Sequence, residues 1–402
     1  MIVGKGAVKT GGGRRPGYLA AAVVFAIGMA GTTLPTPLYG LYQQQIGFSE
    51  LMVTVVFAAY ALSVITVLML VGNYSDRVGR RPVLLCAMAL SAASAGCFLL
   101  ESGLPLLFAG RLLSGGAAGL LSGAATAAVL ELARPGQKAR AGFAATAANM
   151  GGLGCGPLLS GFLAEYSPWP LMLPFWVHLG LVTVACGITW CLPETVPRPE
   201  RWPRPSPQGI AVPAEVKGVF ARASLAAFAG FALLGLFTAV APSFATQTLG
   251  VDNLAVTGAV VFSVFLASTA GQSLTRRIGS RPALPLGCGA LVAGLLLVAS
   301  SLIAESLPLL VLGALFGGMG QGLSFRAALT LVSDAAPAIH RGGTISAFFV
   351  VAYTGISVPV VGVGALATWL GLRDAGLVFA GCVMLLAGAA GTYAALRPPP
   401  QT

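Results

Sequence analysis

The chain has 402 residues, of which 56% are hydrophobic and only 9% are charged, and its formal net charge is +11. Soluble domains carry about 25% charged residues, so this chain has too few charges to cover a soluble surface. The composition argues against a large soluble enzyme and a disordered chain, and it favours a protein surrounded mostly by lipid. The basic residues lie in short segments between apolar runs, which argues against nucleic acid as a partner.

Clusters of charged and turn residues divide the chain into twelve runs, each long and apolar enough to span a membrane as a helix. The longest polar stretch, 193–217, is rich in Pro and Arg and separates six runs from six. We therefore expect an all-α membrane protein with twelve transmembrane helices in two six-helix bundles. The predicted spans are 18–41, 50–71, 83–100, 104–131, 141–164, 170–192, 220–247, 254–273, 283–303, 307–333, 343–368 and 374–396. The predicted domains are the tail 1–17, the bundle 18–192, the linker 193–219, the bundle 220–396 and the tail 397–402.

The basic residues also predict how the chain is oriented in the membrane. With the N-terminus in the cytoplasm, 20 of the 23 Lys and Arg residues fall in cytoplasmic segments and one, Arg373, falls in an outer loop. The other two, Arg111 and Arg326, lie inside spans. Because cytoplasmic loops carry the excess of Lys and Arg, we expect a multi-pass protein of the cell membrane, with the lipid bilayer around it and both termini in the cytoplasm.

The two halves of the chain resemble each other in sequence. Residues 104–120, LPLLFAGRLLSGGAAGL, align with 307–323, LPLLVLGALFGGMGQGL, and the loop 76–82, DRVGRRP, aligns with 276–282, RRIGSRP. Two similar bundles with the same orientation would be related by an axis along the membrane normal, which places a pathway between them. The alternative is chance similarity between segments rich in Gly, Ala and Leu.

The loop between the second and third spans carries the most specific motif. Its sequence, GNYSDRVGRRP at 72–82, resembles the G-x-L-A-D-R-x-G-R-R loop of the major facilitator superfamily, with Tyr74 in place of Leu. Arg80 can pair with Glu131 at the end of the fourth span. The resemblance implies that such contacts latch the halves in the outward-open state and break when the protein opens inward. The alternative is a set of loose bases that only orient the chain. The predicted latch residues are Gly72, Asp76, Arg77, Gly79, Arg80, Arg81 and Glu131.

Two residues inside the spans are candidates for proton coupling. Arg111 opens an R-x-x-x-G-x-x-x-G pattern with Gly115 and Gly119, which resembles a second motif of the superfamily. The resemblance implies that Arg111 tunes a proton-binding group. His178 can carry a proton near neutral pH. The structural alternative for Arg111 is that it bonds to carbonyl groups of other helices, which offsets the cost of its charge in lipid. The structural alternative for His178 is that it packs in the core.

The fifth span carries a third motif. Its sequence, GGLGCGPLLSG at 151–161, resembles the antiporter motif G-x-x-x-G-P-x-x-G-G through Gly152, Gly156, Pro157 and Gly161. Small residues let helices pack closely, and Pro bends a helix. The resemblance implies efflux by exchange, and the alternative is ordinary packing of small residues.

Polar and aromatic residues on several spans are candidates to line the pathway between the halves. All 12 acidic residues avoid the middle of the membrane, so no deep carboxylate is available as a proton-coupling site. The few charges inside spans favour an apolar or weakly polar solute, although Arg326 either snorkels to the surface or contacts an anionic substrate. Two prolines at 32–39, TTLPTPLY, are expected to break or bend the first span. The cavity candidates are Thr32, Thr33, Asn149, Phe237, Gln321, Arg326 and Tyr353.

These patterns together predict a secondary transporter of the major facilitator type that works by alternating access. The finer prediction is proton-coupled efflux of a small hydrophobic or drug-like solute by a monomer, with no enzymatic activity and no cofactor or metal. The sequence lacks a GxxxxGK[ST] phosphate-binding loop, so ATP-driven transport is not supported. Uptake or export of a metabolite such as a sugar or an organic acid is the alternative within transport, and a non-transporting receptor is the alternative outside it.

Overall fold

The computed structural model describes residues 17–72, 74–100, 103–197 and 211–396. All regular structure in these residues is helical, which confirms the predicted fold class. Residues 198–210 of the predicted linker and the predicted tails, apart from Gly17, lie outside the described residues.

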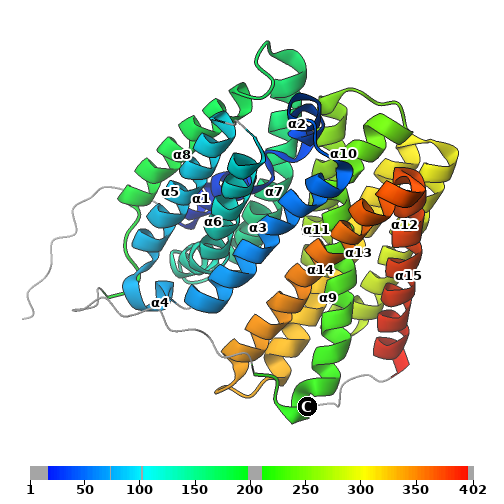
Figure 1. Cartoon of the computed structure of the whole chain (residues 1–402). Helices are drawn as coiled ribbons and strands as arrows, with labels where there is room; N and C mark the ends of the chain where they lie inside the picture. Colours follow the sequence, from blue (N-terminus) through cyan, green and yellow to red (C-terminus); the bar gives the residue numbers. More distant parts are fainter. Residues whose placement is uncertain (1–16, 73, 101–102, 198–210, 397–402) are drawn as a thin grey trace, which may run out of the picture.

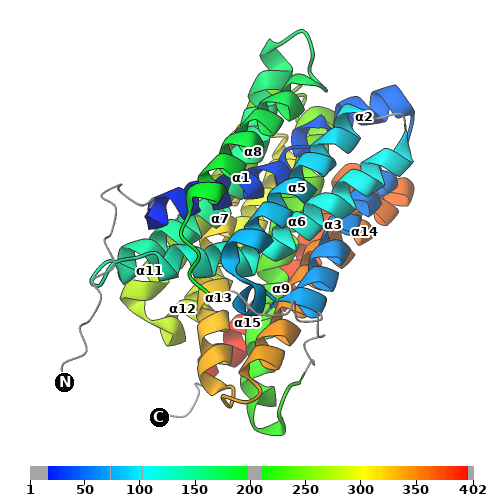
Figure 2. The ribbon, with the colours of Figure 1, turned by 90° about the vertical axis from the view of Figure 1, so that its left-hand side faces the viewer.

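The N-terminal half forms one bundle of long helices (Figure 2). Its first helix is interrupted and continues as a short second piece. In chain order the elements are α1 (Tyr18–Thr33), the 3-10 helix η1 (Thr36–Leu38), α2 (Tyr39–Ile46), α3 (Glu50–Val71), α4 (Ser75–Val78), α5 (Arg80–Leu99), α6 (Leu104–Glu131), α7 (Lys138–Tyr166) and α8 (Leu173–Cys191).

The C-terminal half forms a second bundle, which repeats the pattern of an interrupted first helix. Its elements are the 3-10 helix η2 (Ala214–Val216), α9 (Lys217–Ala239), α10 (Ala241–Ser243), the π-helix η3 (Phe244–Thr248), α11 (Leu254–Ile278), α12 (Ser280–Ala304), α13 (Leu307–Ala335), α14 (Arg341–Leu370) and α15 (Leu372–Leu396).

Eleven helices in the described part of the chain are long and apolar enough to cross a membrane, with α1 to α2 taken as one span. The remaining long helix, α7, falls short of that apolarity because it is rich in Gly and Ala and begins with Lys138. It packs between α1 and α11 and needs fewer lipid-facing side chains. Together these helices give the twelve-helix arrangement that the sequence predicted.

Proline explains the interruption in each half. The residues around Pro35 and Pro37 leave the α-helical pattern after Thr33, as predicted, because proline lacks the backbone N–H that continues a helix. In the second half α9 ends at Ala239, and Pro242 lies in the short α10. Both interruptions lie at the same end of the molecule (Figure 1). We call this the α2 end, and we call the opposite end, which carries α4, the α4 end.

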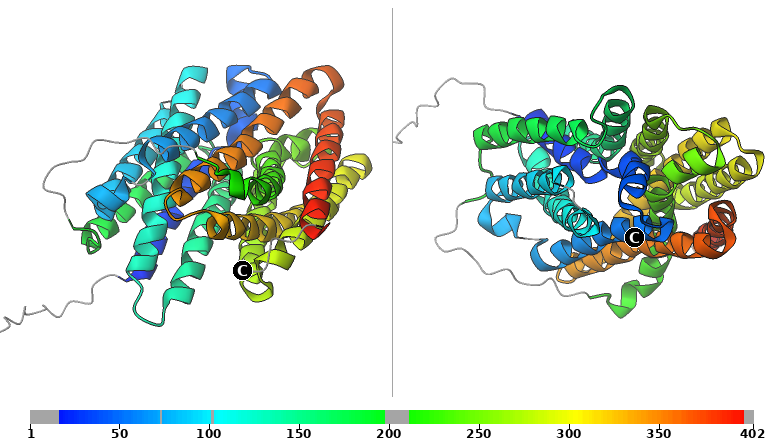
Figure 3. Two further views of the ribbon diagram at one scale, coloured as in Figure 1. Left: turned by 90° about the horizontal axis from the view of Figure 1, so that it is seen from below. Right: turned by 45° about the horizontal axis from the view of Figure 1, so that its top comes forward.

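The two halves lie side by side (Figure 3). They meet along two helix pairs, α3 with α14 and α7 with α11. In the second pair an added Cβ at Gly161 would collide with the backbone of Leu254, and one at Gly258 would collide with the backbone of Pro157. The backbones of α7 and α11 therefore approach each other closely at these glycines, which have no side chain to keep them apart.

The other glycines of the predicted antiporter motif face α1. An added Cβ at Gly152 would lie 2.6 Å from the carbonyl oxygen of Ala26, and one at Gly156 would collide with the carbonyl oxygen of Ala30. The motif thus lies on both sides of α7, with two glycines against α1 and Gly161 against α11. This placement is close packing, and the exchange role that the resemblance implies stays a prediction.

The close contact between α1 and α7 can be tested with two alanine variants of one helix. Gly156→Ala should lower the free energy of unfolding by about 1–3 kcal/mol, because its Cβ has no room. Gly151→Ala is the control, since nothing lies within 4 Å of its added Cβ, and alanine there should be neutral or stabilise the helix by up to about 1 kcal/mol. Thermal melting of the purified variants in detergent measures the difference. Equal melting temperatures would contradict the packing.

Candidate functional site

A cavity of about 300 Å³ lies between the two halves. Its walls come from α1, α3, α6 and α7 on one side and from α9, α11, α13 and α14 on the other. It starts near the interruption of the first helix, at Thr32 and Thr33, and extends to Leu130 and Arg276 at the α4 end. Both of these last residues are exposed, so the cavity reaches the surface at the α4 end.

The lining of this cavity is mostly apolar and strongly aromatic. The rings are Phe57, Tyr60, Phe231, Phe265, Phe325, Phe349 and Tyr353. Small polar side chains, among them Ser122, Thr126 and Gln272, are spread between them. Such a surface suits a solute with an apolar body and few polar groups.

Five of the seven predicted cavity residues line it: Thr32, Thr33, Asn149, Arg326 and Tyr353. The hydroxyl of Thr33 donates a hydrogen bond to the carbonyl oxygen of Leu153 on α7, at 2.7 Å. The buried Oδ1 atom of Asn149 has no hydrogen-bond partner among the described residues, which leaves this amide available to a ligand.

The other two predicted cavity residues, Phe237 and Gln321, lie outside this lining. Phe237 is fully buried in the core, and the cavity-facing residues of α9 are Phe231, Leu234 and Thr238. One residue advances a helix by about 100°, so Phe237 points away from the stripe that ends at Thr238. Gln321 is also fully buried and lies outside the lining, where its Oε1 atom accepts a hydrogen bond from Ser268 at 2.6 Å.

The α2 end is closed by hydrogen bonds between the halves. Glu50, the first residue of α3, accepts hydrogen bonds from Ser243 at 3.1 Å and from Gln247 at 2.6 Å, both in the C-terminal half. Gln43 of α2 donates a third bond to Glu50, at 3.1 Å. We call Glu50, Ser243 and Gln247 the outer gate cluster, in line with the predicted orientation.

A second carboxylate of the N-terminal half reinforces this closure. Glu165, near the end of α7, accepts a hydrogen bond from the backbone N–H of Leu254 at 2.8 Å. Between these two contacts lies a hollow of about 690 Å³, whose lining includes Gln44, Glu165, Gln247 and Asp252. This hollow lies at the α2 end, on the far side of the closure from the cavity.

Arg111 is fully buried next to the closed end of the cavity. Its Nη1 donates a hydrogen bond to the carbonyl oxygen of Thr32 at 2.6 Å. The rings of Tyr39, Phe57 and Tyr60 surround its guanidinium at 5.2 to 5.6 Å. Cation–π contacts therefore replace a carboxylate partner in the described structure. The carbonyl bond is the kind expected of a structural arginine, and the coupling role of Arg111 stays a prediction.

His178 lies away from the cavity, in the core of the N-terminal half. Its Nε2 atom is 2.9 Å from the hydroxyl of Ser91 on α5, and its Nδ1 has no hydrogen-bond partner among the described residues. A solute in the cavity does not reach this ring, so a direct role of His178 in coupling receives no support from its position.

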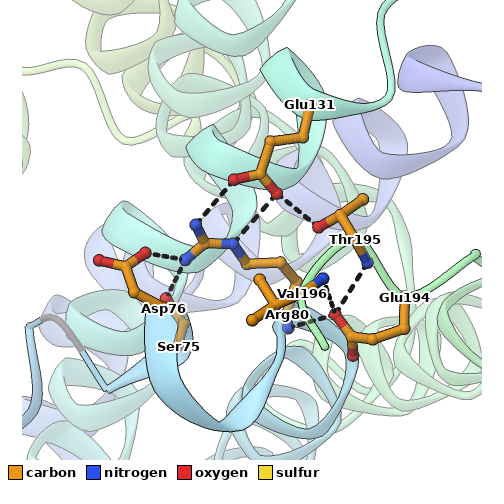
Figure 4. A network of polar contacts seen from close by, with 7 residues as sticks. All are labelled: Ser75, Asp76, Arg80, Glu131, Glu194, Thr195 and Val196. Atoms are coloured by element: carbon orange, nitrogen blue, oxygen red, sulfur yellow. Dashed lines mark hydrogen bonds and ion pairs between the residues drawn. The ribbon is translucent and has the colours of Figure 1, made fainter. Parts of the chain in front are cut away.

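The predicted latch residues form a polar network at the α4 end (Figure 4). The guanidinium of Arg80 donates to Glu131 from Nη2 at 2.7 Å and from Nε at 3.2 Å. The same group forms an ion pair with Asp76 and donates to Ser75 at 2.6 Å. The pairing of Arg80 with Glu131 agrees with the expectation from the sequence.

Glu194 adds a helix cap to this network (Figure 4). Its two carboxylate oxygens accept hydrogen bonds from the backbone N–H groups of Arg80 at 2.8 Å and Arg81 at 3.0 Å. These groups begin α5 and have no partner within their own helix. The preceding residue, Gly79, has φ +106 and lies against the same carboxylate, so a side chain there would be strained and crowded.

The remaining latch residues flank this network. Arg81 donates to the carbonyl oxygen of Trp190 at 2.6 Å, and Gly72 ends α3. The bonds described for Arg80 all stay within the N-terminal half, and they are present while the α2 end is closed. A contact between the halves through this network stays a prediction, as does its breaking during transport.

Three contributors to the site were not selected from the sequence. Arg276 aligns with Asp76 in the internal repeat, so the reversal of charge at this position was a visible signal. Glu50 follows Ser49, which caps α3, but nothing in a single sequence indicates its partners in the other half. Tyr60 lies on a uniformly apolar helix, where the side that faces the cavity is not marked.

Comparisons with known proteins were consistent with this architecture. The family model described as the Major Facilitator Superfamily matches residues 19–359. The class B tetracycline resistance protein of Escherichia coli is 36% identical over 141 residues, which are 34% of this chain and 33% of that protein. The chain thus spans about a third of the length of the curated relatives that it matches.

Solved structures give the same fold over nearly the whole chain. The human organic anion transporter MFSD10 (TETRAN) has a TM-score of 0.64 and 19% identity, and the match covers 93% of this chain and 98% of that one. A bacterial homologue of the human lysosomal transporter Spinster, solved in an inward-facing and unoccupied conformation, has a TM-score of 0.69 and 14% identity over 95% of this chain and 98% of that one.

Removal of the Glu50 carboxylate should open the α2 end. Glu50→Ala removes its bonds to Ser243 and Gln247, which we expect to cost the closed state about 1–2 kcal/mol, or roughly five- to thirtyfold in population. Spin labels on cysteines at positions 44 and 248, in a chain whose native cysteines are replaced by alanine, report the distance between the halves. Glu305→Ala is the control, because the ion pair that Glu305 forms among the described residues is with Arg373 of its own half, at 3.9 Å. An unchanged distance distribution in Glu50→Ala would contradict the gate.

Loss of Glu131 should destabilise the N-terminal half. Glu131→Gln leaves the largely buried Arg80 with Asp76 as its remaining charged partner, and we expect a loss of about 1–2 kcal/mol in the free energy of unfolding. Asp334→Asn is the matched control, because Asp334 aligns with Glu131 in the repeat and is exposed. Thermal melting in detergent compares the two variants. Similar melting temperatures would show that the ion pair contributes no net stability.

Proposed function

Because the chain belongs to the major facilitator superfamily and is a membrane transporter of that family, we propose that it exports a small hydrophobic or drug-like solute in exchange for protons. In this proposal the α4 end faces the cytoplasm, since the loops at that end carry the excess of Lys and Arg. The protein works by alternating access, in which the two bundles rock around a site between them.

One observation carries the proposal: the cavity between the halves reaches the surface at the α4 end while the α2 end is closed. A solute from the cytoplasm has a path to the aromatic lining and none to the outside. This is the state that a transporter needs to load its solute for export. The partial match to a tetracycline resistance protein supports export over uptake, because that protein confers resistance.

The proton has no carboxylate in the described cavity lining, so we assign its entry to the outer gate cluster. Glu50 accepts bonds from Ser243 and Gln247 at both carboxylate oxygens. A proton on one oxygen removes an acceptor for one of these donors, which weakens the closed gate. Glu165 and Asp252 are the other acids at the adjacent hollow. Protonation from outside would thereby favour the outward-open state, in which the solute leaves. The exchange is completed when Glu50 releases this proton towards the cavity and the cytoplasm as the α2 end closes again.

Everted membrane vesicles with an internal pH-gradient dye test the proposal. A panel of tetracycline, lipophilic cations, aromatic carboxylates and small metabolites is added to acidified vesicles. We expect at least one compound to collapse the pH gradient, and we expect an Asp76→Asn, Arg111→Ala double variant, matched for expression, to slow this at least tenfold. Glu50→Gln should slow proton release while labelled solute still exchanges across vesicles without a gradient.

The outcomes separate the alternatives within transport. Movement of labelled solute with no change in the pH gradient would remove proton exchange and leave uniport or another ion. Uptake into right-side-out vesicles, driven by an acidic exterior, would reverse the direction and favour import of a metabolite. Glu305→Gln serves as the control for Glu50→Gln, because it removes an acid that lies outside the gate cluster.

A further inference from the structure

We propose that the central cavity binds an aromatic organic anion, with Arg326 as the deep anion-binding group and Arg276 as a second cation at the α4 end. The inference rests on the proposed function, because it names the chemical class of the exported solute. It follows from the charges of the cavity, the depth of Arg326 and the arrangement of the rings.

The charged side chains in the described lining are two guanidiniums, with no Asp, Glu or Lys among the lining residues. Arg276 and Arg326 also act on each other electrostatically. Two like charges that share an apolar cavity repel each other, and no ion pair to a carboxylate balances either of them within the described residues. An anion placed in the same cavity relieves this repulsion, whereas a cation adds to it.

Arg326 lies too deep for a simple surface base. It is nine residues before Ala335, the last residue of α13, which corresponds to about 14 Å along the helix axis. Its side chain is half-buried, and no hydrogen bond or ion pair of its guanidinium occurs within the described part of the chain. A guanidinium without partners at this depth is costly unless a ligand supplies the acceptors.

Aromatic rings share the cavity lining with this arginine. Phe325 precedes it on α13, and its ring centroid lies 5.2 Å from that of Phe231 on α9. Phe231 in turn contacts Tyr353 edge to face at 5.6 Å. A flat aromatic ligand can stack on such a cluster while its carboxylate reaches Arg326. An aromatic anion therefore uses both features of the cavity at once.

Arg276 lies at the α4 end of the cavity, and the neighbouring Arg277 serves as a control for it. Its Nη1 donates to the carbonyl oxygen of Ala139 on α7 at 3.0 Å, which places the guanidinium across the two halves at the α4 end of the cavity. The next residue, Arg277, is equally exposed but does not line the cavity. If the bases at this end only orient the chain in the membrane, loss of either arginine leaves ligand binding unchanged. If Arg276 attracts the ligand, its loss weakens ligand binding more than the loss of Arg277 does.

Equilibrium binding of two xanthene dyes to the purified full chain tests the inference. The probes are 5-carboxyfluorescein, an aromatic carboxylate anion, and rhodamine 6G, a cation with a similar ring system. Fluorescence anisotropy is measured in an uncharged detergent, with protein-free micelles as the blank. We expect carboxyfluorescein to bind at least tenfold more tightly than rhodamine 6G. Arg326→Gln should weaken carboxyfluorescein binding at least tenfold, and Arg326→Lys should weaken it less.

Arg276→Gln and Arg277→Gln keep the inference testable if Arg326→Gln fails to fold. Arg276→Gln should weaken carboxyfluorescein binding at least threefold, whereas Arg277→Gln, with the same loss of charge at the same helix end, should stay within twofold of the original chain. Tighter binding of rhodamine 6G, no binding of carboxyfluorescein, or equal losses in Arg276→Gln and Arg277→Gln would each overturn the inference.

The dye-binding experiment and the vesicle experiment test the anion class and the proposed export separately. The dye measurement needs no membrane gradient, so carboxyfluorescein binding without any solute movement in vesicles would overturn the proposed export alone. Proton-coupled movement of lipophilic cations together with absent carboxyfluorescein binding would leave export standing and overturn the anion class alone.

Discussion

A polar group inside a membrane finds no water to bond with, and the architecture of this chain follows from that constraint. Long helices satisfy their own backbone groups, and within the first span of each half the chain departs from the α-helix where protein covers it. The residues from Leu34 to Tyr39 and from Val240 to Ala245 are buried, and the π-helix becomes exposed only towards its end, at Gln247. The irregular backbone therefore lies at the α2 end between the halves, where a gate needs segments that bend.

The contacts between the halves differ in kind along the molecule. At the α2 end they are hydrogen bonds of Glu50 and Glu165, which break individually at modest cost. Between α7 and α11 they are close approaches of backbone at Gly161 and Gly258 near the α2 end. Farther along the same pair, the side chain of Phe262 lies against Gly154, and Arg276 donates a hydrogen bond to Ala139 at the α4 end. Small residues thus keep these two helices in close contact at the α2 end, while side chains join them towards the α4 end.

The fold could be predicted from the sequence more fully than the site. Apolar runs and prolines mark the spans and their interruptions directly, and the charge of Glu131 identified the partner of Arg80. The side of a helix that faces a cavity is not marked in the same way. The membrane-spanning part of α9 is apolar on all sides, so the sequence does not distinguish Phe237 from Phe231 and Thr238, which line the cavity. Glu50 was missed for another reason, because its partners come from the other half, some two hundred residues away in the chain.

The aromatic cage of Arg111 has a consequence for leakage through the closed protein. This cation lies between the end of the cavity and the α2 end, and the rings that hold it leave its positive charge uncancelled. Any hydronium ion moving along a transient file of water through this plug would have to pass that charge at close range, in surroundings that screen it poorly. A fixed arginine raises the electrostatic barrier to cations in narrow pores in the same way. The caged charge of Arg111 thus places an electrostatic barrier to cations between the cavity and the α2 end.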